Sequence, residues 1–242
     1  MRVALDGKKA LVTGGTRGIG RAVALGIATA GADVIACYRN EGEAVDSLAV
    51  QLKEIPGDHH LVRADVSQPD DVDRLVKTCE DTYGGLDVVV NNAGAISHIP
   101  FEELELDEWR RVVDANLTSA FMVTKRTLPI LSGGASIVLI GSKVAAVGVP
   151  MRSHYTAAKA GLVGLARSLC KELGPKGIRI NVVAPGIIDT NPLPPEVLKR
   201  YQTIIALGRL GHAEEIANLV TFLASDLASY ITGETINADG GT

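Results

Sequence analysis

The fold is decided by the stretch Lys8-Lys9-Ala10-Leu11-Val12-Thr13-Gly14-Gly15-Thr16-Arg17-Gly18-Ile19-Gly20. The part up to Thr13 predicts a short β-strand, and the alanine-rich segment from the last glycine to Gly31 predicts a helix. The glycines between them let the backbone approach a pyrophosphate, and the start of the helix presents N–H groups to it. Ordinary turn chemistry is the alternative. The position of the turn, between the first strand and the first helix, favours a dinucleotide site.

The alternation of strand and helix continues along the chain. We expect further strands at 33–38, 60–65, 86–90, 137–141, 178–183 and 235–237, and further helices at 41–55, 69–83, 107–128 and 213–224, with a long helix that carries Tyr155 and Lys159. This pattern indicates a parallel sheet with right-handed crossovers and helices on both faces. No linker or repeat divides residues 1–242. We therefore expect an α/β fold: one doubly wound, Rossmann-type domain.

Composition excludes several classes of partner. A net charge of −4 offers no general attraction to nucleic acid or to an anionic membrane. The chain begins with a strand and a glycine turn instead of a signal sequence, so we expect a soluble, cytoplasmic protein. Cys37, Cys79 and Cys170 lie outside any C-x-x-C pattern and are expected to stay reduced. The five histidines have no ligand spacing, so no metal site is expected.

Polar residues follow several of the expected strands at their carboxyl ends, where doubly wound sheets bind ligands. Asp65, after the third strand, is placed to accept a hydrogen bond from an adenine amino group, although an ordinary turn aspartate is an equal alternative. Asn91, at the end of the fourth strand, is expected to pin loop backbone near a ribose. Ala93 and Gly94 beside it allow a close approach.

The choice between NAD and NADP depends on the end of the second strand. Enzymes that use NAD commonly place an acidic residue there for the ribose hydroxyls. Here the strand ends Tyr38-Arg39-Asn40, and Glu41 falls in the next helix. Arg17, in the glycine turn, can approach the same position. Two guanidinium groups suit a phosphate, so we expect NADP(H) as the cofactor.

Tyr155 and Lys159 are four residues apart, so on a helix they share one face. A nearby ammonium favours the phenolate and is expected to bring the pKa of Tyr155 closer to neutral pH. Ser142, at the end of the fifth strand, adds a hydroxyl that can hold a carbonyl oxygen. Taken alone, this pattern also fits an ordinary helix surface.

Together the motifs resemble the short-chain dehydrogenase/reductase family over essentially the whole chain. The resemblance is carried by Thr13-Gly14-x-x-x-Gly18-Ile19-Gly20, Asn91-Asn92-Ala93-Gly94, Asn116, Ser142, Tyr155-x-x-x-Lys159 and Pro185-Gly186. The segment from Gly208 to Gly233 is similar to reductases of 3-oxoacyl carriers and of polyketides. Family members are commonly dimers or tetramers built on the long helices, so the resemblance implies a homo-oligomer.

The resemblance also implies roles for single residues. Tyr155 would protonate a ketone oxygen, Lys159 would lower the pKa of that tyrosine and hold the nicotinamide ribose, and Ser142 would orient the carbonyl. Asn116 would keep a water molecule in a proton relay. The backbone of Ile188 would bind the carboxamide, and Thr190 would bind the diphosphate.

The expected site has three parts. The catalytic residues are Asn116, Ser142, Tyr155 and Lys159. The cofactor-binding residues are Gly14, Thr16, Arg17, Gly18, Ile19, Gly20, Arg39, Asn40, Asp65, Val66, Asn92, Ala93, Gly94, Tyr155, Lys159, Pro185, Gly186, Ile188 and Thr190. The substrate is expected to contact Ser142, Val144, Val149, Met151, Tyr155 and Ile187, beneath a lid at about 187–206. Further pocket candidates are residues 95–99.

Two substrates are compatible with the resemblance. A fatty-acid-type 3-oxoacyl reductase docks an acidic carrier protein through basic residues near the active-site entrance, and the turn at 128–135 carries no cation. That turn looks more like reductases of free aromatic polyketides, such as hydroxynaphthalene and angucycline ketoreductases. We therefore favour a polycyclic aromatic ketone of an antibiotic-type pathway, with the carrier-bound 3-oxoacyl group as the alternative. A cofactor sensor that has lost catalysis is less favoured, because the chain keeps Asn116, Ser142, Tyr155 and Lys159.

Overall fold

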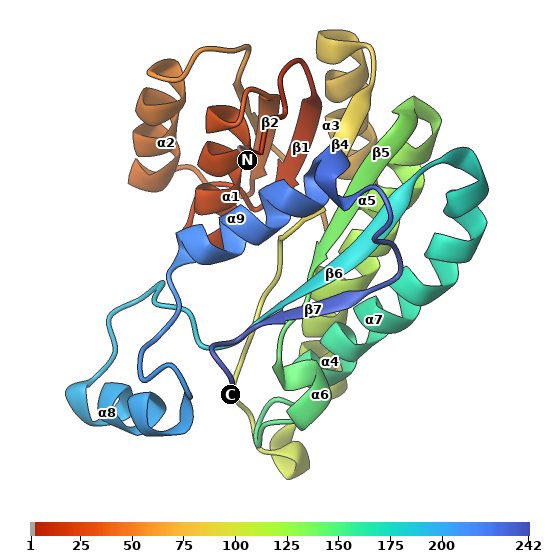
Figure 1. Ribbon diagram of the computed structural model, residues 1–242. Coiled ribbons are helices and arrows are strands. Elements are labelled where there is room, and N and C mark those ends of the chain that lie inside the picture. Colours follow the sequence, from red (N-terminus) through yellow and green to blue (C-terminus); the bar gives the residue numbers. More distant parts are fainter. Residues whose placement is uncertain (1–2) are drawn as a thin grey trace.

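A computed structural model describes residues 3–242 and places seven parallel strands in one sheet (Figure 1). The strands are β1 (Lys9–Thr13), β2 (Asp33–Tyr38), β3 (His60–Arg63), β4 (Leu86–Asn91), β5 (Leu131–Ile140), β6 (Arg179–Pro185) and β7 (Thr235–Ala238). They lie in the order β3-β2-β1-β4-β5-β6-β7, so the strand order reverses between β1 and β4. The predicted doubly wound α/β fold is confirmed.

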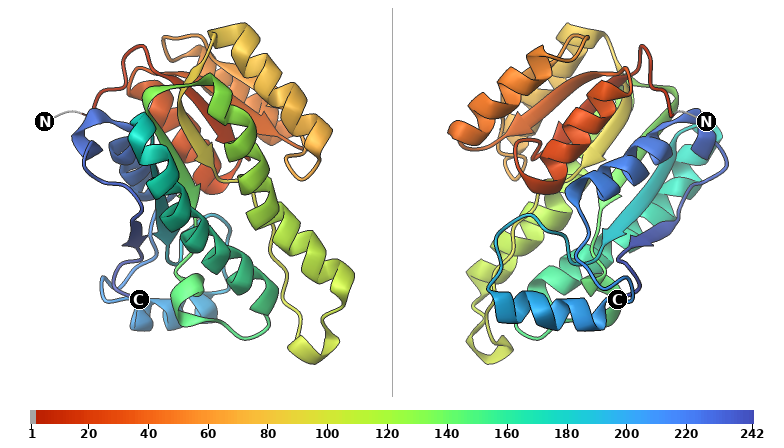
Figure 2. Two further views of the ribbon diagram at one scale, coloured as in Figure 1. Left: turned by 90° about the vertical axis from the view of Figure 1, so that its right-hand side faces the viewer. Right: turned by 60° about the vertical axis from the view of Figure 1, so that its left-hand side comes forward.

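Helices cover both faces of this sheet (Figures 1 and 2). One face packs against α1 (Gly18–Thr29), α2 (Glu43–Lys53) and α9 (Ala213–Ala224). The other face packs against α3 (Pro69–Tyr83), α5 (Ser119–Thr127) and α7 (Ser153–Leu173). Within residues 3–242, no helix combines the length and the apolar character that a membrane span needs.

The central strands are apolar because both of their faces are buried. Successive side chains of a strand point to opposite faces. In β4, Val88 and Val90 pack into the core beneath α1 and α9, whereas Val89 packs into the core beneath α3 and α5. All three valines are fully buried. The three cysteines are free and buried, and burial raises the pKa of the Cys37 thiol to about 12.

The single helix expected at 107–128 is interrupted. The structure has α4 (Leu106–Val113), a π-helical turn (Asp114–Thr118) and then α5. The Asn116 side chain donates from Nδ2 to the Val112 carbonyl at 2.8 Å, which is the acceptor that its own backbone N–H uses in an α-helix. This competition accounts for the widened turn. Such turns are frequent at functional sites.

Two helices were not predicted. Val144–Val147 forms the short helix α6, and Pro195–Ile204 forms α8 within the segment that we expected to be a lid, where no helix was predicted. The prolines near 195 favour a loop in the sequence, but proline is also well tolerated in the first turn of a helix. No residue of α8 is buried, and the helix stands away from the body of the domain (Figure 1).

Candidate active site

Two adjoining cavities lie at the carboxyl ends of the strands. The first, of about 220 Å³, is lined mainly by the loops that follow β1, β2 and β3. The second, of about 300 Å³, is lined by residues that follow β4, β5 and β6, together with α7. Gly94 and Ala95 line both cavities and join them. The sheet therefore brings segments that are distant in the sequence to one elongated site at its strand-order reversal.

The glycine turn between β1 and α1 suits a pyrophosphate. No side chain among residues 3–242 caps the start of α1, so its first amide groups remain available to an anion. Gly20 lies so close to the backbone that a Cβ there would overlap the Gly14 carbonyl oxygen and the Asn92 amide. Asn92 fixes the turn by donating to the carbonyls of Thr13 and Gly14, both at 3.0 Å.

The role that we expected for Asn91 belongs to the next residue. Asn91 is buried and donates to the Thr124 hydroxyl on α5 at 3.1 Å, so the prediction that it pins the loop backbone is wrong. Side chains alternate along β4. Asn91 therefore points into the core beneath α5, and Asn92 reaches the glycine turn instead. The Thr13 hydroxyl also accepts from the Asn92 and Ala93 amides, each at 3.0 Å.

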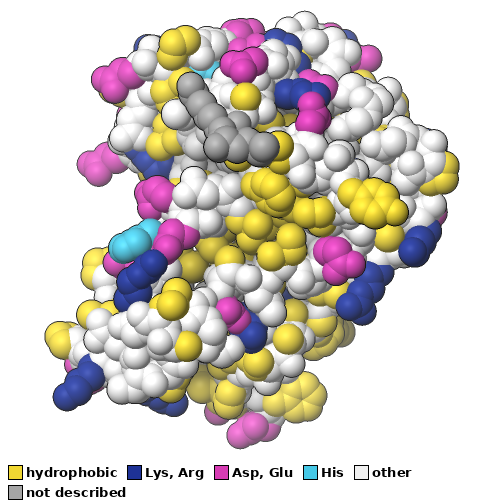
Figure 3. Space-filling model, viewed as in Figure 1, with side chains coloured by type: hydrophobic (Ala, Val, Ile, Leu, Met, Phe, Trp, Pro, Cys, Tyr) yellow, Lys and Arg dark blue, Asp and Glu magenta, His cyan; other side chains and the backbone are white. Residues whose placement is uncertain are grey.

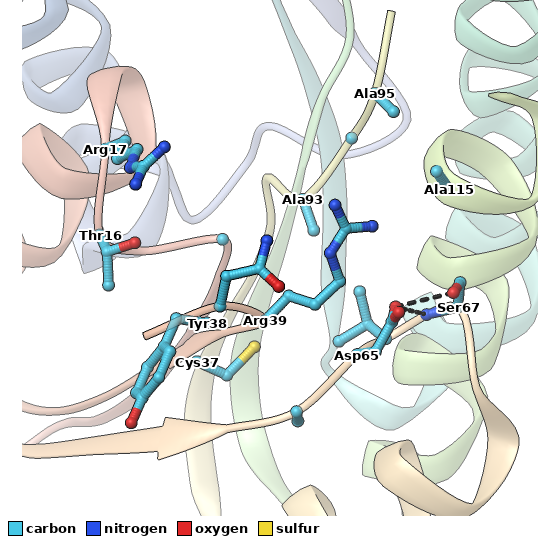
Figure 4. Close-up of a pocket in the computed structure, with 15 residues that line it drawn as sticks. Thr16, Arg17, Cys37, Tyr38, Arg39, Asp65, Ser67, Ala93, Ala95 and Ala115 are labelled. Carbon is cyan, nitrogen blue, oxygen red and sulfur yellow. Dashed lines mark hydrogen bonds between the residues drawn. The ribbon is translucent and has the colours of Figure 1, made fainter. Parts of the chain in front are cut away.

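Arg17 and Arg39 both line the first cavity, from different elements (Figure 4). Arg17 comes from the glycine turn, and Arg39 extends from the end of β2 into the cavity. Asp65 lines the same cavity and accepts from the Ser67 hydroxyl at 2.7 Å. The other predicted cofactor residues on this side also line it: Gly14, Thr16, Asn40, Val66, Ala93 and Gly94. Two cations in one cavity match a phosphate group.

The second cavity brings together the four residues predicted to be catalytic. Asn116, Ser142, Tyr155 and Lys159 line it from the π-helical turn, the end of β5 and the start of α7. It is also lined by the predicted cofactor residues Ile19, Asn92, Gly94, Pro185, Gly186, Ile188 and Thr190. Gly18 and Gly20 shape the turn and do not line either cavity.

Lys159 is a buried cation at the base of this cavity. Its Nζ donates to the Ile140 carbonyl at 2.7 Å and lies 5.6 Å from the centre of the Tyr155 ring. Burial disfavours the charged ammonium and lowers the pKa of Lys159 to about 8. This lysine therefore changes its charge much closer to neutral pH than an exposed lysine does.

The expected effect on Tyr155 is different from what the structure shows. Burial raises the pKa of Tyr155, and the nearby Ser142 hydroxyl and Arg152 charge only partly oppose the rise. The Lys159 ammonium lies 5.6 Å from the centre of the Tyr155 ring and donates to the Ile140 carbonyl. A raised pKa keeps the phenol protonated, which suits a group that donates a proton.

Asn116 has one end fixed and one end open. Its Nδ2 donates to the Ala95 carbonyl at 2.7 Å, in addition to the bond to Val112. Its Oδ1 is buried and has no hydrogen-bond partner among the described residues. A Cβ at Gly94 would come within 2.5 Å of this oxygen and 3.7 Å of Lys159 Nζ. An unsatisfied buried acceptor beside a lysine matches a site for water or a ligand hydroxyl.

Some predicted substrate residues lie elsewhere. Val144, Val149 and Met151 do not line the second cavity, and Val144 begins the short helix α6. Ile187 lines an adjoining cavity, together with Leu207 and Gly240. Seven lining residues were not predicted: Cys37, Tyr38, Ala64, Ser67, Ala115, Ile140 and Gly141. Most of these have small or apolar side chains, and only their position at the strand ends could have marked them.

The lowered pKa of Lys159 predicts how the free energy of unfolding depends on pH. Between about pH 8 and pH 10.4 the unfolded chain holds a proton on this lysine that the folded chain has lost, so its contribution to stability improves as pH rises. Relative to Lys159→Met, the wild type should gain about 2–3 kcal/mol of unfolding free energy from pH 7 to pH 10. Urea unfolding at both pH values measures this difference. An unchanged difference would show that the buried lysine has an ordinary pKa.

The fold and the site define an oxidoreductase that acts on C=O or CH–OH groups: a doubly wound sheet, an uncapped glycine turn and a buried tyrosine–lysine pair at one edge. The chain belongs to the short-chain dehydrogenase/reductase family. The family model described as "Enoyl-(Acyl carrier protein) reductase" matches residues 14–242.

Relatives match along their whole length. The chain is 39% identical to a 3-oxoacyl-[acyl-carrier-protein] reductase of Synechocystis, over 98% of each chain. It is 40% identical to the Aquifex aeolicus protein of the same name, over 100% of this chain and 99% of that one. Among solved structures, a blue fluorescent protein from a metagenomic library, in complex with NADPH, is 34% identical, covers 98% of both chains and superposes with a TM-score of 0.93.

Proposed function

We propose that this protein reduces 3-oxoacyl groups, presented as thioesters of an acyl carrier protein, with NADPH. The support is the match of 39–40% identity along nearly the whole chain with reductases of that name, together with the four candidate catalytic residues in one cavity. This assignment reverses the preference drawn from the sequence. The aromatic polyketide ketone, favoured there, becomes the second candidate.

The residues fit the cofactor and the reaction. Bound in the joined cavities, NADPH supplies a hydride to the carbonyl carbon. Tyr155, protonated because its pKa is raised, donates a proton to the carbonyl oxygen. Ser142 hydrogen-bonds that oxygen and orients it. Lys159, whose Nζ donates to the Ile140 carbonyl, would also hold ribose hydroxyls of the cofactor. Asn116 Oδ1, which has no partner among the described residues, would accept from a water molecule that relays a proton from solvent.

The uncharged turn at 128–135 lies away from the site and does not count against a carrier protein. Residues 128–135 lie at the amino-terminal end of β5, where Leu131 pairs with Leu86, the first residue of β4. Ser142 follows the opposite end of β5, so the uncharged turn is not at the entrance of the site. Arg152 lies near Tyr155, and α8 exposes Lys199 and Arg200. These cations suit an acidic carrier.

The second cavity accommodates either candidate substrate. The second cavity has a partly apolar wall formed by Ile19, Ile96 and Ile188. A flat ring system would bury apolar surface against such a wall, and so would the acyl chain of a thioester. The wall therefore does not separate the candidates, and a direct comparison of substrates does.

A substrate panel tests the assignment. We expect the purified protein to oxidise NADPH fastest with a 3-oxoacyl thioester of acyl carrier protein, more slowly with the same acyl group on a small thiol, and slowest with a tetralone. A higher kcat/KM for the tetralone would support the aromatic candidate and overturn the proposal. No turnover of any of the three ketones would refute both.

The preference for NADPH is a separate proposal. It is supported by Arg17 and Arg39 in the first cavity and by the absence of an acidic side chain at the end of β2. We expect Arg39→Asp to lower kcat/KM for NADPH by roughly a hundredfold, since it replaces a charge-assisted contact by a repulsion, and to affect NADH much less. Lys53→Asp makes the same charge change at the far end of α2 and serves as the control. A wild type that prefers NADH would contradict this proposal.

A lid and a homo-oligomer are also proposed. The lid is residues 187–206, including the exposed helix α8, which follows Thr190 at the edge of the second cavity. Protection of its amides from hydrogen exchange should rise when NADPH binds.

A dimer or tetramer is supported by exposed Phe121 on α5 and by the hydrophobic side chains near α9, where Leu227 and Tyr230 are exposed (Figure 3). Light scattering measures the molecular mass of the particle in solution, and the mass of a single chain would contradict the proposed oligomer.

A further inference from the structure

Four polar side chains form a hydrogen-bonded series beside the active site. His154, immediately before Tyr155, contacts the Ser97 hydroxyl through Nε2 at 2.8 Å. Ser97 donates to Glu108 Oε1. Glu108 in turn accepts from Arg111 at 2.6 Å and 2.7 Å. The series joins α7 to the loop after β4 and to α4, and His154 on α7 is 57 residues from Ser97 in the sequence.

The direction of these bonds assigns the proton on His154. Arg111 holds Glu108 in its carboxylate form and, with Ser97, lowers the pKa of that carboxyl to about 2. A carboxylate only accepts, so the single proton of the Ser97 hydroxyl is given to Glu108. The same hydroxyl oxygen must then accept from His154. His154 therefore carries its proton on Nε2, and its Nδ1 bears a lone pair.

The surroundings of His154 favour the neutral ring. The side chain is completely buried, and Nδ1 has no hydrogen-bond partner among residues 3–242. The charged or titratable groups that face it are Glu108 and Arg111 on α4 and His98 in the loop. Burial lowers the pKa of His154, Glu108 opposes this shift, and Arg111 and His98 reinforce it. A protonated ring would bury an N–H group without an acceptor.

Ser97 lies in the loop that walls the second cavity. Ala95 and Ile96 line that cavity, and Ser97 follows them directly. The loop is attached on both sides of Ile96: Asn116 binds the Ala95 carbonyl, and Ser97 is held by His154 and Glu108. Further along, the Ile99 amide donates to the Met151 carbonyl at 2.9 Å. Ile96 itself is exposed, so these attachments, and not core packing, set its position.

We propose that His154, Ser97 and Glu108 act as a clamp of positioning residues that sets the cavity wall at Ile96, and with it the fit of the ketone against Tyr155. This inference rests on the proposed function, since it assigns the wall to the substrate side of the same site. Hydrogen bonds to a charged group are stronger than neutral ones. Glu108 therefore anchors Ser97 more firmly than a neutral acceptor would. None of the three residues touches the reacting atoms.

Kinetics with the best substrate of the panel test the clamp. Ser97→Ala and His154→Leu should each raise KM about tenfold, the effect of one lost hydrogen bond to an anchored group, and change kcat less than threefold. His154→Gln, whose amide can donate from a similar position, should restore KM to within about threefold of the wild type. Asp107→Asn removes an exposed ion pair with Arg110 on the same helix and should change neither KM nor kcat.

A kinetic result and an NMR result would each contradict the proposed clamp. Equal losses of kcat in Ser97→Ala and His154→Gln, with KM unchanged, would overturn the clamp. The second measurement needs no variant: the ¹⁵N shifts of the His154 ring should show a protonated Nε2 and an unprotonated Nδ1 at pH 7–8. The opposite tautomer or a charged ring also overturns it. Because this spectrum needs no substrate, it tests the clamp even if the wild type reduces none of the ketones.

Discussion

Tyr155→Phe should lower kcat by roughly 10³-fold while leaving the affinity for NADPH within about twofold of the wild type. The substitution removes only the hydroxyl that donates the proton. The ring stays in place against Lys159, and the residues of the first cavity that hold the cofactor are untouched. Stopped-flow measurement of NADPH oxidation gives the rate, and fluorescence titration gives the affinity.

Tyr83→Phe is the matched control for this change. Tyr83 ends α3 and donates to the Asp58 carbonyl at 2.5 Å, remote from both cavities at the carboxyl ends of the strands. Loss of the Tyr83 hydroxyl should leave kcat unchanged and lower the free energy of unfolding by about 1 kcal/mol. If Tyr155→Phe retains more than a tenth of the wild-type rate, another group supplies the proton, and the mechanism proposed here is wrong.

Gly20→Ala should weaken NADPH binding by roughly a hundredfold, equivalent to about 3 kcal/mol, and should also lower stability. The added Cβ would overlap the Gly14 carbonyl oxygen and the Asn92 amide. Relief requires either the glycine turn to open or Asn92 to give up its bonds to Thr13 and Gly14. Either movement displaces the amides that face the pyrophosphate. Isothermal titration with NADPH and thermal unfolding measure the two losses.

Gly26→Ala tests the same kind of substitution on the same helix. A Cβ at Gly26 would make ordinary contacts with Ala217 and Thr221, at 3.4 Å and 3.6 Å. Alanine is the better helix former, so this variant should unfold at the wild-type temperature or gain about 0.5–1 kcal/mol. NADPH affinity should not change. Similar losses in both variants would mean that α1 tolerates no added methyl group, and the specific role of Gly20 would be refuted.

Much of the fold was predictable because it depends on short-range patterns. The apolar run of β4, the glycine turn before α1 and the stop at Gly84, where φ is +74°, are read within a few residues. The errors arose where a side chain overrides local preference. Asn116 widens the helix that was expected to be continuous, and the prolines before α8 permit a helix that they do not require.

The sequence predicted which catalytic residues come together in the candidate site better than it predicted where the substrate lies. Residues that follow strands were expected to converge, and all four predicted catalytic residues line one cavity. Val144, Val149 and Met151, which we expect to contact the substrate, do not line the cavity of the catalytic residues, and the sequence does not show that Val144 begins the short helix α6. The uncharged turn at 128–135 was read as part of the entrance, although β5 carries it to the opposite edge of the sheet.

By itself, the sequence determined the doubly wound sheet, the glycine turn and the pairing of Tyr155 with Lys159, since each follows from spacing along one strand or helix. Only the tertiary structure decided the ionisation of these groups, because burial is a property of the packed chain. It raised the pKa of Tyr155 and lowered that of Lys159. It also joined His154 to Ser97, which are 57 residues apart, and no local pattern marks such a contact.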